Sequence, residues 1–118
     1  MNLKSLQETL LKKKGATEET PFGPEALVYK VMGKMFALIA WEENPLHITL
    51  KCDPDLALAL RATYPTISAG YHMSKKHWNT IVLDGSIPEN EILMMIDDSY
   101  ALVVKKLRKV DREKLANS

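Results

Sequence analysis

The sequence contains a single cysteine, Cys52, so no disulfide can form within the chain. A lone thiol is typical of a reducing compartment. The longest apolar run, Met35 to Trp41, is far shorter than the roughly 20 residues that a membrane-spanning helix needs. The N-terminal segment carries Glu8 where a secretory signal would have an unbroken apolar stretch. We therefore expect a soluble, cytoplasmic protein that has no contact with a membrane.

The chain also lacks an excess of either charge. Lys and Arg number 16 and Asp and Glu number 15, which gives a formal net charge of +1. This balance excludes a strong hold on polyanions through total charge, so a nucleic-acid site would require positive charge to be segregated locally. The few glycines are scattered and form no phosphate-binding loop.

Groups that could carry catalysis or bind a metal are present but not arranged as a site. His72 and His77 are five residues apart in a segment that is not predicted to be helical, and Cys52 has no companion thiol. Asp97 and Asp98 are adjacent on a predicted helix and therefore point in different directions. We expect no metal site, no cofactor and no enzymatic activity. A thiol enzyme that uses Cys52 with one of these histidines is the remote alternative.

The pattern of apolar and turn-forming residues predicts one α+β domain over residues 1–118, with the order α-β-β-β-α-β-β-α. The long polar segment 16–24 is expected to be a loop, and the charged tail from about residue 109 is expected to fray. The predicted elements are a helix from Leu3 that is capped near Gly15, a hairpin over Ala26–Trp41 that turns at Met32-Gly33, a strand over residues 46–51, a helix over Pro54–Thr63, strands over residues 66–69 and 79–83, and a helix that begins in a Ser86-x-x-Glu89 capping box.

These elements predict a single, largely antiparallel sheet with all helices on one face, which leaves the other face uncovered. If Val31 pairs with Lys34 in the hairpin, alternation places one set of side chains in the core: Leu27, Tyr29, Val31, Phe36 and Leu38. The opposite side of the hairpin carries Lys30. In the next strand Ile48 and Leu50 face the helices, and His47, Thr49 and Lys51 face outward. We expect Lys30 and Lys51 to share a basic outer face.

One segment, from Gly70 to Ile81, concentrates cations and aromatic rings and contains no acidic residue. Such a mixture suits a phosphate backbone or another polar partner. The candidate nucleic-acid-binding residues are Tyr71, His72, Ser74, Lys75, Lys76, His77 and Trp78 from this segment, with Lys30, Lys34 and Lys51 from the other strands. Two other interpretations stay open: the charges belong to an ordinary solvated sheet, or Trp78 packs in the core while Ser74 only closes a turn.

Five short motifs, in order along almost the whole chain, resemble the MmcQ/YjbR family of small bacterial proteins. They are Pro21-Phe22-Gly23, the segment from Lys30 to Ala37, Leu50-Lys51-Cys52-Asp53-Pro54, the segment from Gly70 to Thr80, and Asp98-Ser99-Tyr100-x-Leu102-Val103. The resemblance implies a CyaY-like fold of the double-wing type, with the hairpins Ala26–Trp41 and Thr66–Leu83 as wings. It also implies DNA binding. The family has no assigned enzymatic activity, so the resemblance implies no catalytic residues.

The leading hypothesis is therefore a DNA-binding module that contacts phosphates through a basic sheet face and two hairpin wings. The alternative is a protein-interaction domain that docks a protein partner on its open sheet face.

Overall fold

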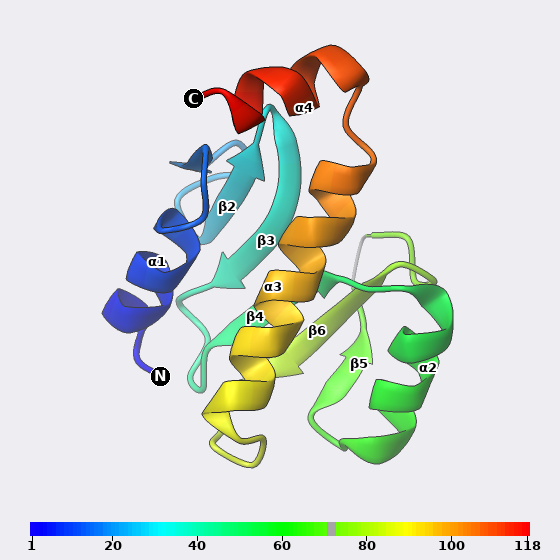
Figure 1. Ribbon diagram of the computed structural model, residues 1–118. Coiled ribbons are helices and arrows are strands. Elements are labelled where there is room, and N and C mark those ends of the chain that lie inside the picture. Colours follow the sequence, from blue (N-terminus) through cyan, green and yellow to red (C-terminus); the bar gives the residue numbers. More distant parts are fainter. Residues whose placement is uncertain (71–72) are drawn as a thin grey trace.

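Apolar residues that alternate along strands and recur at helical spacing build a sheet with helices on one face (Figure 1). The computed structural model describes residues 1–70 and 73–118. The helices are α1 (Leu3–Leu11), α2 (Pro54–Thr63), α3 (Glu89–Lys105) and α4 (Lys109–Ala116). The strands are β1 (Ala16–Glu19), β2 (Ala26–Val31), β3 (Lys34–Ala40), β4 (His47–Lys51), β5 (Ile67–Ala69) and β6 (Trp78–Val82). The predicted α+β class, with one antiparallel sheet, is confirmed.

The sheet has the strand order β1-β2-β3-β4-β6-β5, and every neighbouring pair is antiparallel. In Figure 1 α3 runs across the middle of the sheet; α1 contacts β1, and α2 lies near β5 and β6. Side chains from α1, α3 and α4 meet the inner face of the strands in one hydrophobic core. The other face of the sheet is not covered by these helices.

The predicted hairpin turn at Met32-Gly33 is present, and both residues have left-handed backbone angles, with φ of 49° and 79°. Two consecutive positive φ values give the turn a twist that matches the twist of antiparallel strands. The turn therefore fixes the pairing of Val31 with Lys34.

The pairing beyond this turn differs from the prediction because β3 contains a bulge. The register shifts between Tyr29 and Lys30, so that Phe36 is an extra residue in β3. Phe36 and the next residue, Ala37, are both fully buried. The expected alternation is consequently reversed after Phe36, and Leu38 lies on the outer face instead of the core.

Three further predictions of local structure are wrong. Residues 16–19 form β1 because their backbone pairs with β2, although only Ala16 among them is partly buried. The predicted capping box at Ser86 is absent, since α3 begins at Glu89 and the Ser86 amide donates to the Asp84 carboxylate instead. The tail expected to fray from about residue 109 forms α4, and Leu115 anchors it in the core.

None of the helices in the described residues is both long enough and apolar enough to cross a membrane.

Candidate nucleic-acid interface

The outer face of the sheet carries Lys30 and Lys51 on the same side, as the alternation predicts. Val28 pairs with Leu38, and Leu38 pairs with Thr49, which places these three residues in one row across the strands. Lys30 and Lys51 each lie two residues beyond a member of this row, so both side chains belong to the outer face.

That face is nevertheless not clearly basic, which corrects the prediction. The strand β1 brings Glu19 beside β2, where its Oε1 lies 3.5 Å from the Lys30 Nζ atom. The middle of the face is neutral, and the hydroxyls of Thr49 and Thr80 bond to each other at 2.8 Å. The outer face was predicted to be basic because residues 16–24 were expected to form a loop. As part of strand β1, Glu19 instead lies next to Lys30.

Positive charge gathers instead at one end of the sheet, where β3 begins, β4 ends and α3 ends. Lys34, Lys51 and Lys106 line a groove of about 360 Å³ there, and Trp78 forms part of its wall. An adjoining hollow of about 290 Å³ is lined by three lysines, Lys51, Lys105 and Lys106, and by one acid, Asp53. We call these two hollows together the basic groove. Among the residues that the structure describes, none of its four lysines lies within 4.0 Å of a carboxylate.

The environment of Lys51 is unfavourable for a positive charge. Burial lowers the pKa of the Lys51 ammonium, and the nearby charge of Lys106 lowers it further. A bound anion would reverse both effects, because it would replace the lost hydration and screen the two ammonium groups from each other.

A buried hydroxyl from α3 fixes the end of β4 that carries Lys51. The pairing between β3 and β4 ends at Ala37 and Leu50. In the next position the Ser99 Oγ atom accepts a hydrogen bond from the Lys51 amide at 2.8 Å and donates one to the Phe36 carbonyl at 2.6 Å. Ser99 is fully buried, so its bond to the Phe36 carbonyl is shielded from water, whereas the bond from the Lys51 amide is only partly buried. The side chain thereby ties α3 to the ends of two strands.

The turn that bears Lys75 and Lys76 is held by its own backbone and by Arg61. The Ser74 carbonyl accepts from the amides of His77 and Trp78 at 3.1 and 3.0 Å. Arg61 on α2 donates to the carbonyls of Lys75 and Trp78, and its Nε atom donates to the Asn79 side chain at 2.7 Å. Arg61 is a basic residue, but its guanidinium group positions the turn through these hydrogen bonds.

The base of this segment also requires glycine. The Gly70 amide donates to the Trp78 carbonyl at 2.8 Å. A Cβ atom at Gly70 would lie only 2.8 Å from the Trp78 Cβ atom, which is closer than real side chains approach. Gly70 therefore permits the close contact that sets the position of Trp78 at the start of β6.

The structure separates the predicted site residues into three groups. Lys34, Lys51, His77 and Trp78 line the basic groove. Ser74, Lys75 and Lys76 are exposed on the adjoining turn, and Lys30 lies apart with Glu19. The predicted residues Tyr71 and His72 lie outside the described residues.

Sequence reasoning missed two cations of the groove, Lys105 and Lys106. They are not among the predicted binding residues, whereas in the structure they form the last turn and the cap of α3. Val103 is buried in the core, and this anchor is the signal that the helix continues as far as the lysines.

Cys52 borders the basic groove but is a poor candidate nucleophile. Its side chain is buried, and burial raises the pKa of its thiol, with further increases from the charges of Asp53 and Asp98. A thiol that remains protonated at neutral pH does not act as the thiolate that nucleophilic catalysis requires. The raised pKa therefore argues against the thiol enzyme. Among the described residues, no group of three or more His, Cys, Asp or Glu side chains could hold a metal ion.

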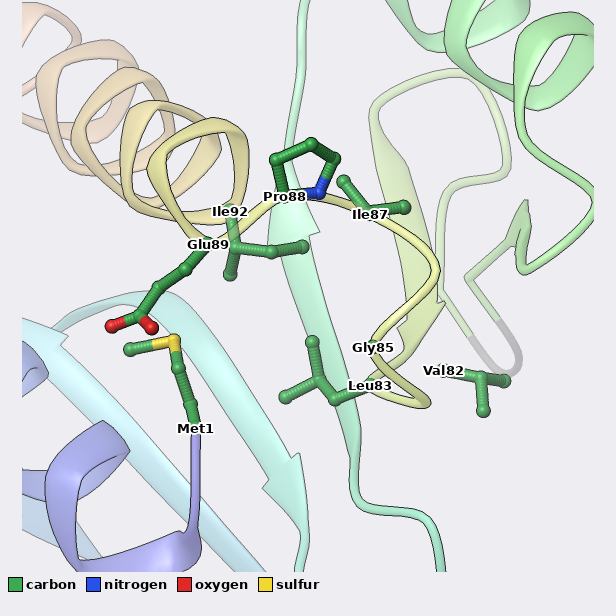
Figure 2. Close-up of a pocket in the computed structure, with 8 residues that line it drawn as sticks. All are labelled: Met1, Val82, Leu83, Gly85, Ile87, Pro88, Glu89 and Ile92. Carbon is green, nitrogen blue, oxygen red and sulfur yellow. The ribbon is translucent and has the colours of Figure 1, made fainter.

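A separate pocket of about 220 Å³ lies at the beginning of α3 (Figure 2). Figure 2 shows the Glu89 carboxylate close to Met1, with Leu83 and Ile92 on the other sides of the pocket. The full lining is Met1, Val82, Leu83, Gly85, Ile87, Pro88, Glu89 and Ile92. This set contains one acid and no basic side chain, so the pocket does not suit a phosphate.

Comparison with known proteins adds a family and a fold. A family model described as YjbR matches residues 11–102. The uncharacterized protein YjbR of Escherichia coli strain K12 is 32% identical over 115 residues, which cover 98% of each chain. The uncharacterized protein YbdF of Escherichia coli O157:H7 is 41% identical over 95 residues, which cover 80% of this chain and 78% of YbdF.

Solved structures agree with this assignment. The crystal structure of Deinococcus radiodurans protein DR2400, described as a DUF419 domain, superposes with a TM-score of 0.91 at 36% identity. The match covers 98% of this chain and 88% of that one. A crystal structure of a protein from Pseudomonas syringae has a TM-score of 0.74 at 30% identity, over 86% of this chain and 98% of that one. The names of these relatives carry no activity, so a function has to be argued from the site itself.

Proposed function

The chain belongs to the YjbR family, and we propose that it is a DNA-binding protein that contacts phosphates through the basic groove and the adjoining turn at Lys75 and Lys76. The observation that carries this proposal is the meeting of Lys34, Lys51 and Lys106 from β3, β4 and the end of α3 around one hollow.

One acid, Asp53, lines the groove together with its four lysines. The described residues include no carboxylate within ion-pair distance of its lysines. The C-terminus of α3 contributes a partial negative charge of only about half a unit. Four lysines and one lining carboxylate leave the groove with a net positive charge, and a phosphate backbone supplies the negative charge that balances it.

The proposal predicts phosphate-dominated binding with little reading of base sequence. A duplex of arbitrary sequence, labelled for fluorescence anisotropy, should bind with an affinity that falls steeply as salt is added, by about 0.9 log units per log unit of salt for each phosphate contacted. Replacing Lys51 and Lys106 together by glutamine should weaken binding and reduce this slope by about two units.

A matched control is available on another surface. Lys4 and Lys12 are exposed on or next to α1, so the Lys4→Gln, Lys12→Gln double variant changes the net charge equally without touching the groove. The proposal fails if the wild-type protein does not bind DNA at low salt. It also fails if the control variant loses as much affinity as the groove variant.

The open sheet face favours a second candidate, a protein-interaction domain. Leu38, Met35 and Val82 on this face are only partly buried, and partly exposed apolar side chains beside Trp78 could receive a protein partner. Affinity capture from lysate with and without nuclease distinguishes the candidates, because a protein partner survives nuclease treatment. Replacing Leu38 by glutamate should then abolish that capture and leave DNA binding unchanged.

A further inference from the structure

An apolar cleft lies between the first turn of α2 and the C-terminal half of α3. Its volume is about 250 Å³, and its walls are Leu56 from α2 and Ala101 and Leu102 from α3. Figure 1 shows the two helices on the same side of the sheet, with α2 to one side of α3. Leu56 is 43% exposed, so a large apolar side chain borders an open space. We call this space the interhelical cleft.

The interhelical cleft is continuous with the basic groove. Cys52, Asp53, Leu102 and Lys105 line both the cleft and the adjoining hollow of about 290 Å³. The combined space reaches the range of roughly 300–1,000 Å³ that is typical of sites for small ligands. The cleft end is largely apolar, and the hollow end carries three lysines and one carboxylate, that of Asp53, so the space is complementary to a molecule with an apolar, flat part and an anionic group.

Asp98 narrows the choice of ligand. It lies on α3 one turn before Leu102 and two turns before Lys105, so the three residues form one stripe along the cleft. In the described part of the chain, no basic side chain lies within 4.0 Å of the Asp98 carboxylate. An alkyl chain would gain nothing from this carboxylate and would desolvate it. A heterocyclic base can instead pack its apolar faces against the leucines and donate N–H groups to the carboxylate.

We propose that the interhelical cleft and the basic groove form a nucleotide site, which holds the base between Leu56 and Leu102 and the phosphate on Lys51, Lys105 and Lys106. Asp98 accepts hydrogen bonds from the edge of the base. The phosphate half of this inference rests on the proposed function, and the base half is independent of it. A base within a duplex is stacked and cannot enter the cleft, so the site takes an unpaired nucleotide of single-stranded DNA or a free mononucleotide.

The test compares inorganic phosphate, nucleoside monophosphates and a single-stranded oligonucleotide by NMR titration of the wild-type protein. Guanosine, adenosine and cytidine monophosphates should bind at least about fivefold more tightly than inorganic phosphate, which is the gain expected when about 40 Å² of apolar surface is removed from water. Resonances of the Leu56 side chain should shift with the nucleotides but not with phosphate, whereas those of Lys105 and Lys106 should shift with both. Tighter binding of the oligonucleotide than of the mononucleotides identifies the source as single-stranded DNA, and the reverse order identifies a free nucleotide.

Two leucines of α2 give a matched pair of variants. Leu56→Glu closes the cleft with an acidic side chain, whereas Leu58, which is 63% exposed and does not line the cleft, provides the control Leu58→Glu. Both positions are at the surface, so both variants are expected to fold. Leu56→Glu should remove the advantage of nucleotides over inorganic phosphate, Asp98→Asn should reduce it, and Leu58→Glu should leave it unchanged.

The outcomes separate this inference from the proposed function. If duplex DNA binds with a lysine-dependent salt slope but monophosphates bind no more tightly than inorganic phosphate, the nucleotide site is refuted and DNA binding stands. If mononucleotides bind in a Leu56-dependent manner but no DNA binds, the nucleotide site stands and the proposed function is refuted. Equal effects of Leu56→Glu and Leu58→Glu would also refute the nucleotide site.

Discussion

Replacing Ser99 by alanine should destabilise the protein and disturb its basic groove at the same time. The hydroxyl of Ser99 is fully buried and serves two backbone groups, the Phe36 carbonyl and the Lys51 amide. Alanine removes both hydrogen bonds and leaves these two groups without the partner that the fold provides for them.

The expected loss follows from these two groups. A backbone group left unsatisfied in a protein interior costs about 1–3 kcal/mol, so two such groups cost about 2–6 kcal/mol. Alanine is the better helix former at position 99 of α3 by about 0.5 kcal/mol, and partial access of water to the Lys51 amide lowers the cost further. We expect the free energy of unfolding to fall by about 2–4 kcal/mol, which for a domain of this length lowers Tm by about 3–6 °C per kcal/mol.

Urea unfolding followed by circular dichroism measures this change. Ser68→Ala is the control, because Ser68 is exposed on the short strand β5 and the replacement has the same chemistry. The Lys51 amide should also exchange with deuterium faster in the Ser99→Ala variant, since it has lost its acceptor. A decrease in the free energy of unfolding below about 0.5 kcal/mol, the range of ordinary surface substitutions, would refute the assigned role of Ser99.

Three other substitutions test separate features. Arg61→Lys should keep the charge but lose the forked contacts to the turn, so the backbone amides of residues 74–78 should exchange with deuterium faster. Because Arg61 positions the turn, DNA affinity should fall as far in Arg61→Lys as in Arg61→Ala. The raised thiol pKa of Cys52 means that the folded state binds the proton more tightly than the unfolded state. The stabilisation from the protonated thiol is therefore complete below the ordinary pKa of 9.0 and is lost as pH rises beyond it. In urea unfolding, the free energy of unfolding of Cys52→Ala should decline less above this pH than that of the wild type. Gly33→Ala should cost about 1 kcal/mol in thermal unfolding, because φ at Gly33 is 79° and a Cβ atom there meets no other atom within 4 Å, so that only backbone strain opposes it.

The parts of the fold that the sequence predicted are those with strong local signals. Helix α2 has the predicted bounds, because Asp53 caps it, Pro54 begins it and Pro65 follows its end. The turn at Met32-Gly33 is likewise fixed by two residues. Strand β1 and the bulge at Phe36 have no such signal, since each depends on how the chain pairs with β2 and not on a residue type at a fixed position.

The candidate site was predicted in part for the same reason. Alternation along β4 correctly placed Lys51 on the outer face, but it could not show that Glu19 would neutralise Lys30. The convergence of Lys34, Lys51 and Lys106 depends on where α3 crosses the sheet, which no local pattern determines. Sequence reasoning could therefore identify the cations and could not select those that share a groove.

The irregularity of the sheet explains why the lysines converge at this end. The bulge at Phe36 ends the regular pairing of β3 with β4, and the Ser99 hydroxyl bonds the two backbone groups that follow. Because Ser99 is on α3, this contact sets the position of the helix end, and Lys106 then lies close enough to Lys51 to lower its pKa. Two like charges held together by a buried and specific contact reduce the stability of the protein. Local arrangements that oppose stability are concentrated at functional sites, and an anion bound between these lysines would convert the repulsion into affinity.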